Sequence, residues 1–179
     1  MKKNSWLLLL LLIPAFTNAQ KTTVDANWNA EAGPILSVPI RYMHYFTVFG
    51  IGADVAANRG IIDRLYGGGR MNYTYFFGKG SIEGEDYNLG LFNAMADVYY
   101  LFDFKMLLGF SGGLGLTFNT GVSDANFSRV FYAGYLFNTQ HHDYVITAFF
   151  DQTNYQKNIG IRACIRLPVS SIFAGKKKE

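Results

Sequence analysis

Apolar and polar residues alternate through most of the chain, in short segments separated by turn-forming residues. A period of two indicates β-strands, because successive side chains of a strand point to opposite faces. Long stretches rich in Gly, Tyr, Phe and Thr also have weak helix propensity. The pattern predicts eight strands, at residues 28–40, 45–56, 65–77, 87–101, 104–118, 129–138, 142–151 and 158–167.

Most of these segments have one apolar face and one polar face. In the last of them, NIGIRACIRL (158–167), Ile159 and Ile161 alternate with Arg162, and Arg166 falls on the same face as Arg162. The segment SRVFYAGYLF (128–137) is apolar on both faces, so the pattern does not assign its register.

The first nineteen residues have the organisation of a secretory signal peptide. Lys2 and Lys3 form a positive n-region, WLLLLLLIPAF (6–16) forms an apolar core, and Thr17 and Ala19 supply the small residues of a cleavage site. The predicted organisation is a signal peptide at 1–19, a barrel domain at 20–168 and a short C-terminal tail at 169–179. We therefore expect the protein to be exported.

Composition narrows the class of exported protein. Aromatic residues make up 17% of the chain and charged residues only 16%, against about 25% charged in ordinary soluble domains. Beyond the signal peptide no apolar run reaches the roughly 18 residues of a membrane-spanning helix. An apolar exported chain of alternating segments predicts an all-β protein, an eight-stranded antiparallel up-and-down transmembrane barrel.

The connections fit this topology. With the N-terminus in the periplasm, GKGSIEGED (78–86) and NTGVSDANFS (119–128) become long polar loops at the outer end, and LFDF (101–104) becomes a tight inner turn. The first outer loop, around Tyr42 and Met43, is short.

Charged residues of both signs fall on the predicted inner faces. A barrel of eight strands has room inside for little more than its own side chains, and a buried charge without a partner is costly. We therefore predict a paired lumenal network. Its members are Glu31, Arg41, Asp54, Arg70, Asp97, Lys105, Asp143, Asp151, Arg162 and Arg166.

A soluble barrel of the lipocalin kind is the alternative fold. Such a barrel also alternates, but its apolar face points inward and its charged face meets water. The small residues on the polar faces and the balance of charges favour the transmembrane arrangement. The soluble barrel would bind an apolar ligand.

The strand pattern, signal peptide and last strand resemble the small outer-membrane barrels of Gram-negative bacteria, of the OmpA transmembrane domain and OmpX type. In NIGIRACI (158–165), Asn158, Gly160, Ala163 and Ile165 are similar to the terminal signal read by the barrel-assembly machinery. The segment lacks the final aromatic residue of that signal, and residues 168–179 follow it. The resemblance implies contact with outer-membrane lipid and lipopolysaccharide, and a role in envelope integrity or surface interaction.

No motif identifies catalytic chemistry or a cofactor site. Some barrels of this kind are lipid A-modifying enzymes, and His44 lies near outer-loop residues that could supply a hydroxyl and an acid; these are Ser81, Glu83, Glu85, Asp86, Ser123 and Asp124. Nothing in the spacing brings them together. Adjacent histidines in HHD (141–143) point to opposite faces of a strand and are poorly placed to share a metal ion.

The remaining features exclude other classes. YGGGR (66–70) lacks the Lys-Ser or Lys-Thr of a phosphate loop, and Cys164 is the single cysteine, which excludes an intramolecular disulfide. Removing residues 1–19 lowers the formal net charge from +3 to +1, which gives no reason to expect nucleic acid as a partner. The sequence predicts a non-enzymatic barrel with a plugged lumen, and it does not identify a surface partner.

Overall fold

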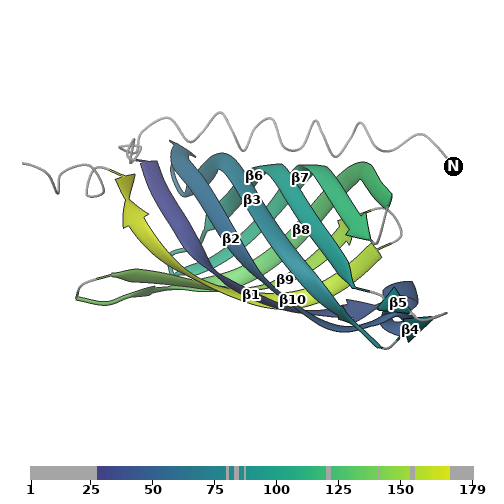
Figure 1. Cartoon of the computed structure of the whole chain (residues 1–179). Coiled ribbons are helices and arrows are strands. Elements are labelled where there is room, and N and C mark those ends of the chain that lie inside the picture. Colours follow the sequence, from purple (N-terminus) through teal and green to yellow (C-terminus); the bar gives the residue numbers. More distant parts are fainter. Residues whose placement is uncertain are drawn as a thin grey trace, which may run out of the picture.

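A computed structural model of the chain is a closed β-barrel (Figure 1). The structure describes residues 28–79, 81–82, 85–86, 88–119, 122–140, 142–153 and 156–169. The predicted signal peptide and the predicted tail beyond residue 169 lie outside these ranges, as do Glu83 and His141.

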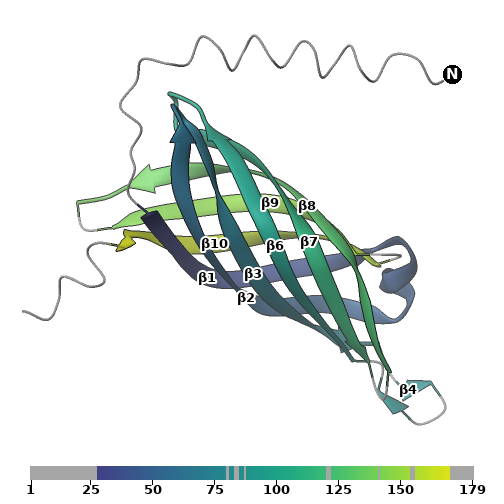
Figure 2. The same ribbon diagram turned by 90° about the horizontal axis from the view of Figure 1, so that it is seen from above.

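The barrel has eight antiparallel strands that pair in chain order, which confirms the predicted up-and-down topology (Figure 2). They are β1 (Trp28–Ile40), β2 (Thr47–Ile62), β3 (Leu65–Gly78), β6 (Leu89–Leu101), β7 (Met106–Asn119), β8 (Val122–Asn138), β9 (Asp143–Thr153) and β10 (Gln156–Pro168). Strand β10 pairs with β1 and closes the barrel. The connection from β1 to β2 contains the 3-10 helix η1 (Arg41–Tyr45), and the connection from β3 to β6 contains the hairpin of β4 (Ser81–Ile82) and β5 (Glu85–Asp86).

The strands are staggered, so that a row of paired residues runs obliquely around the wall toward the outer end. From Ala30 of β1, registered partners run through Ala57, Gly69, Ala96, Gly112, Arg129, Gln152 and Lys157. The row returns to β1 at Ile40, ten residues farther toward the outer end. Such a stagger tilts the strands relative to the barrel axis. Cross-strand neighbours therefore lie at different depths.

Two strands are longer than the alternation predicts. Strand β2 continues to Ile62 instead of ending at residue 56, and Asp63 and Arg64 make the turn to β3. The predicted long outer loop at 119–128 is wrong, because β8 begins at Val122 and pairs with β7 from there. Ser123, Asp124 and Ala125 are all exposed, so this stretch has no buried face to produce the expected alternation.

The inner turns are joined to one another by polar contacts. Arg64 of the β2–β3 turn and Lys105 of the β6–β7 turn both have positive φ, 63° in each case. The Arg64 guanidinium forms an ion pair with Asp103 at 2.6 Å, and this hydrogen-bonded carboxylate raises the pKa of Arg64. The Lys105 Nζ donates to the amide oxygen of Asn138 at the end of β8. These contacts hold neighbouring turns together.

The outer wall of the barrel is apolar. Large side chains that point away from the barrel are well exposed, among them Leu36 (63%), Leu108 (59%) and Ile161 (58%). Tyr100, Tyr135 and Tyr144 lie near the inner ends of their strands, and Phe49, Phe118 and Phe127 lie near the outer ends. Aromatic residues at both borders of an apolar band are typical of the two membrane interfaces. No helix among the described residues is long and apolar enough to cross a membrane.

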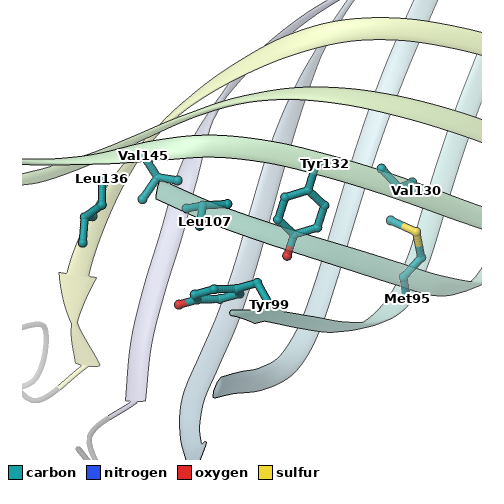
Figure 3. Packing of buried hydrophobic residues seen from close by; sticks show 7 residues of the cluster. All are labelled: Met95, Tyr99, Leu107, Val130, Tyr132, Leu136 and Val145. Atoms are coloured by element: carbon teal, nitrogen blue, oxygen red, sulfur yellow. The ribbon is translucent and has the colours of Figure 1, made fainter. Parts of the chain in front are cut away.

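The interior combines a small apolar cluster with polar side chains. The cluster lines the inner faces of β6, β7, β8 and β9 (Figure 3), and its members are Met95, Tyr99, Leu107, Val130, Tyr132, Leu136 and Val145. Gly109 faces the same interior and is paired with Tyr132 across β7 and β8. The Tyr132 ring covers Gly109 so closely that a methyl group at residue 109 would overlap the ring. The glycine is therefore required by packing.

We expect Gly109→Ala to lower the free energy of unfolding by about 1–3 kcal/mol, the usual effect of overpacking. The matched control is Gly69→Ala, because at Gly69 an added methyl group would lie 3.9 Å from its nearest neighbour, the carbonyl oxygen of Met95. Urea unfolding of the refolded barrel in lipid vesicles measures both variants. Equal midpoints for the two would contradict the packing role of Gly109.

Candidate functional site

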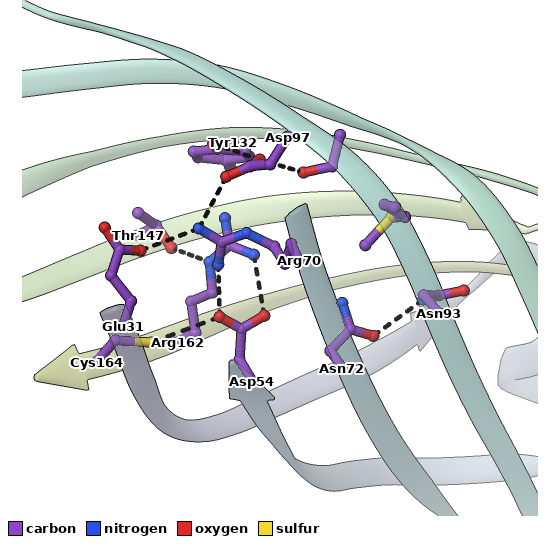
Figure 4. Close-up of polar contacts among 12 residues, drawn as sticks. Glu31, Asp54, Arg70, Asn72, Asn93, Asp97, Tyr132, Thr147, Arg162 and Cys164 are labelled. Carbon is purple, nitrogen blue, oxygen red and sulfur yellow. Dashed lines mark hydrogen bonds and ion pairs between the residues drawn. The ribbon is translucent and has the colours of Figure 1, made fainter. Parts of the chain in front are cut away.

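Arg70 is the centre of the charged interior. Its guanidinium contacts three carboxylates, at 2.5 Å from Asp54, 3.1 Å from Glu31 and 3.3 Å from Asp97 (Figure 4). These residues come from β1, β2, β3 and β6, which are consecutive in the barrel wall. All four are buried. One cation therefore neutralises acids from three other strands.

Arg162 of β10 is the second cation of this cluster. Its Nη1 lies 3.5 Å from the Asp54 carboxylate, and its Nε donates to the Thr147 hydroxyl at 2.7 Å. The guanidinium also lies over the Tyr132 ring, 4.3 Å from its centroid. Stacking on an aromatic face adds a cation–π attraction to the hydrogen bonds. Asp54 is thus shared by two arginines.

Arg166 extends the cluster toward the inner end. It lies 3.9 Å from Glu31 and donates to the Tyr99 hydroxyl at 2.6 Å. Its guanidinium is 5.1 Å from the centroid of the Tyr66 ring. Arg166 therefore connects the charged cluster to the aromatic side chains of β3 and β6.

Asp97 accepts hydrogen bonds from two hydroxyl groups as well. The Ser111 hydroxyl donates at 2.6 Å and the Tyr132 hydroxyl at 2.7 Å, both to the same carboxylate oxygen. The Arg162 guanidinium also lies over the Tyr132 ring, so Tyr132 contacts both Asp97 and Arg162.

Asp151 belongs to a separate polar group nearer the outer end. Its carboxylate accepts from Asn93 at 3.1 Å, Thr153 at 3.2 Å and Ser128 at 3.3 Å. Asn93 also donates to Asn72 at 3.0 Å. Among the described residues no cation forms an ion pair with Asp151, so neutral donors satisfy this acid.

A small cavity separates the two polar groups. It is lined by Arg162, Asp151, Asn72, Thr74, Ile35, Val130 and Phe149, and has a volume of about 10 Å³. A cavity of this size holds about one water molecule. The Nη2 atom of Arg162 has no hydrogen-bond partner among the described residues.

The structure places seven of the ten predicted network residues in the interior. Glu31, Asp54, Asp97, Asp151, Arg70, Arg162 and Arg166 are all at most 6% exposed. The other three lie at the barrel ends, which corrects their predicted lumenal position. Arg41 is exposed in η1, Lys105 is exposed in the β6–β7 turn, and Asp143 is half-buried, accepting a hydrogen bond from Asn138 at 2.8 Å. Alternation gives the face of a strand but not the height along it.

Neutral partners of the network could not be chosen from the sequence. Tyr99, Tyr132, Ser111 and Thr147 each bond to a charged group. Tyr132 lies in the segment whose register the pattern leaves open. Gly109 faces Tyr132 and leaves room for its ring, so this glycine indicates a large inward side chain on the neighbouring strand. That inference can be made only once the pairing of β7 with β8 is known.

The residues considered for catalysis do not form a described constellation. His44 is exposed in η1 and its described contact is with the edge of the Tyr45 ring, 6.0 Å between centroids. Ser123 and Asp124 are exposed at the outer end of β8. Among the described side chains no hydroxyl or carboxylate bonds to His44. His142 is exposed, and no group of three potential metal ligands occurs among the described residues.

Comparisons with known proteins find similar folds among solved structures and no match by sequence. No protein-family model matches the sequence, and no curated protein matches it. The structure of Neisserial surface protein A superposes with a TM-score of 0.60 at 14% identity, covering 79% of this chain and 96% of that one. Ail, the attachment invasion locus protein of Yersinia pestis, gives 0.50 at 15% identity, covering 80% and 99%. Ail in complex with the heparin analogue sucrose octasulfate also gives 0.50, at 16% identity, covering 79% and 98%.

The chain therefore has the fold of the small eight-stranded outer-membrane barrels, as the resemblance in sequence pattern predicts. Its apolar outer wall and charged interior are inverted relative to a soluble barrel, so the lipocalin-like alternative is wrong. A closed barrel with this polarity spans a membrane, and the bacterial outer membrane is where such barrels occur.

We expect Arg70→Met to reduce the free energy of unfolding by about 3–5 kcal/mol, because it leaves three buried carboxylates without their shared cation. Arg70→Lys keeps the positive charge and should reduce the free energy of unfolding by less. Arg64→Met is the control, since it removes an exposed arginine–aspartate pair and should leave the urea midpoint near that of the wild type. A wild-type midpoint for Arg70→Met would show that the interior does not depend on this cation.

Proposed function

We propose that the protein is a non-enzymatic outer-membrane barrel with a closed lumen, and that it acts through its outer end, in surface interaction or in support of the envelope. The observation that carries the proposal is the filling of the interior by Arg70, Arg162 and their carboxylate partners. The cavity beside them is about the size of one water molecule. A hydrated ion would have to break these ion pairs to pass.

The outer end supports a role at the surface. It carries η1, the β4–β5 hairpin and the exposed outer part of β8. The β8 residues from Val122 to Phe127 pair with β7, whereas pairing with β9 starts only at Ser128. The hairpin of β7 and β8 thus rises above its β9 neighbour. Two proteins with this fold are described as a surface protein and as an attachment invasion locus protein.

A lipid A-modifying activity is less well supported. A general base would need a nucleophile within hydrogen-bond distance and a group to orient it. The described contact of His44 is with the Tyr45 ring. If this activity is absent, expression of the protein leaves the mass of lipid A unchanged, and His44→Ala gives the same spectrum as the wild type.

We expect no stable single-channel conductance when the refolded barrel is inserted into planar bilayers. The double variant Arg70→Ala, Arg162→Ala removes two of the three lumenal arginines and is the comparison. Gel mobility before and after boiling verifies that each sample is folded. Discrete conductance steps from the folded wild type would contradict the closed lumen.

We expect a variant in which a short Gly-Ser turn replaces residues 81–86 to fold normally and to lose adhesion of expressing cells to a sulfated polysaccharide such as heparin. This replacement removes β4 and β5 and leaves the eight barrel strands intact. Detergent sensitivity of the same cells separates the two roles. A surface role is supported if the variant loses adhesion while the detergent sensitivity of the cells stays unchanged. An envelope role is supported if cells without the barrel become detergent-sensitive and cells with the 81–86 variant do not.

A further inference from the structure

Three charged side chains point outward from the described barrel strands, and two of them lie in one cross-strand row, on either side of a glutamine. Arg59 lies at the inner end of β2, while Arg129 of β8 and Lys157 of β10 lie toward the outer end. Among the described residues, the other outward positions beside Arg129 and Lys157 are occupied by apolar residues, by Gly112 or by Gln152. This pair of cations therefore interrupts an apolar wall.

Arg129, Gln152 and Lys157 form one cross-strand row. Gln152 of β9 is the registered partner of Arg129 on one side and of Lys157 on the other. Directly paired side chains have Cβ atoms about 4.5–5.5 Å apart, so the two cations flank one amide and stand roughly 10 Å from each other. Among the described residues neither cation forms an ion pair with a carboxylate.

Within this oblique row Lys157 lies nearest the outer end of the barrel, and Gln152 and Arg129 lie progressively deeper. Lys157 is the second residue of β10 and its registered partner on β1 is Ile40, the last residue of that strand. On β8, Phe127 is the next outward side chain toward the outer end, and it is 65% exposed. A cation on the lipid-facing wall is tolerated near an interface and becomes costly with depth. An anion supplied by the lipid would remove that cost.

An open apolar groove lies immediately below the row. The groove winds around the wall, with lining residues from all eight barrel strands, and its total volume is about 1250 Å³. Below the row its lining includes Ile159, Phe150 and Phe131, with Ile161, Ala148 and Ala133 one position deeper. Ile159, Phe150 and Phe131 are the next outward positions below Lys157, Gln152 and Arg129. The stagger of the strands makes the groove descend from the outer end into the membrane. Cations at the upper edge of an apolar groove match the amphipathic shape of a lipid.

We propose that Arg129, Gln152 and Lys157 bind the phosphorylated headgroup of the outer-leaflet glycolipid, lipid A, with an acyl chain in the groove below. This inference rests on the outer-membrane orientation of the proposed function. Two phosphates on a disaccharide provide two anionic groups for two cations that are two strands apart. The amide of Gln152 lies between them and can donate to a phosphate or sugar oxygen.

The test is lipid binding by the full chain without its signal peptide, refolded in detergent and followed by native mass spectrometry. The probes are bisphosphorylated lipid A and the same lipid after removal of its phosphates. The double variant Arg129→Gln, Lys157→Gln should bind the phosphorylated lipid about 30-fold more weakly than the wild type, if each cation contributes as basic residues do at a membrane surface. Arg59→Gln is the matched control, because it removes an outward-facing cation at the opposite end.

Retained binding in Arg59→Gln, weak binding in the double variant and weak binding of the dephosphorylated lipid would support the site. If the double variant does not fold, each single variant should show about a fivefold loss. Equal binding of the two lipids, or an equal loss in Arg59→Gln, would overturn the proposal. A folded barrel that fails this test can still have a closed lumen and a surface role, so its failure is distinct from failure of the proposed function.

Discussion

The pairing of Arg70 with three buried carboxylates is the interaction on which the interior depends. Closing eight strands directs every second side chain into a narrow space, and Glu31, Asp54 and Asp97 reach that space from three strands. The acids are too deep to be hydrated freely, and one guanidinium has enough donors to serve them together. Arg162 then joins the cluster through Asp54 and extends it to β10, the strand that closes the barrel. These contacts therefore link side chains of β1, β2, β3, β6 and β10 across the interior.

Much of this fold follows from the alternation of residue types, because the period of a strand needs no knowledge of its neighbours. The inward direction of Arg162 and Arg166 could be predicted in this way, since Ile159, Ile161 and Ile165 occupy the other face. The same reasoning placed Lys105 in the lumen, where it does not lie. Lys105 has the parity of the polar face, but β7 starts at Met106, two residues later than the predicted start, and Lys105 is in the turn. Depth along the barrel depends on where strands end, and at the ends no buried face constrains the sequence.

Strand β8 shows the second limit of prediction from sequence. Apolar residues occupy both of its faces, because Val130, Tyr132 and Leu136 pack inside while Phe131, Tyr135 and Phe137 face outward. The sequence pattern of β8 therefore does not show which residues face inward, and only the pairing with β7 and β9 assigns the two faces. Arg129 is the residue most affected. Without the register, Arg129 could equally belong to the lumenal network. Its row with Gln152 and Lys157 could not be predicted, because these residues are far apart in the sequence.

Cations of the two faces meet different electrostatic requirements. Arg70, Arg162 and Arg166 are enclosed with carboxylates from the same chain, so the fold itself supplies their counter-charges. Arg129 and Lys157 lie on a wall whose described neighbouring outward side chains are apolar apart from Gln152. Of the acids of β9, Asp151 points into the lumen and Asp143 lies at the opposite, inner end of the strand. Since the wall separates the two sets, no rotation of a side chain can exchange partners between them. The described residues supply no counter-charge for the outer pair, which is the ground for proposing an anionic lipid headgroup there. The barrel thus carries two sets of basic side chains, one enclosed with carboxylates of the same chain and one on the outer wall without a described counter-charge.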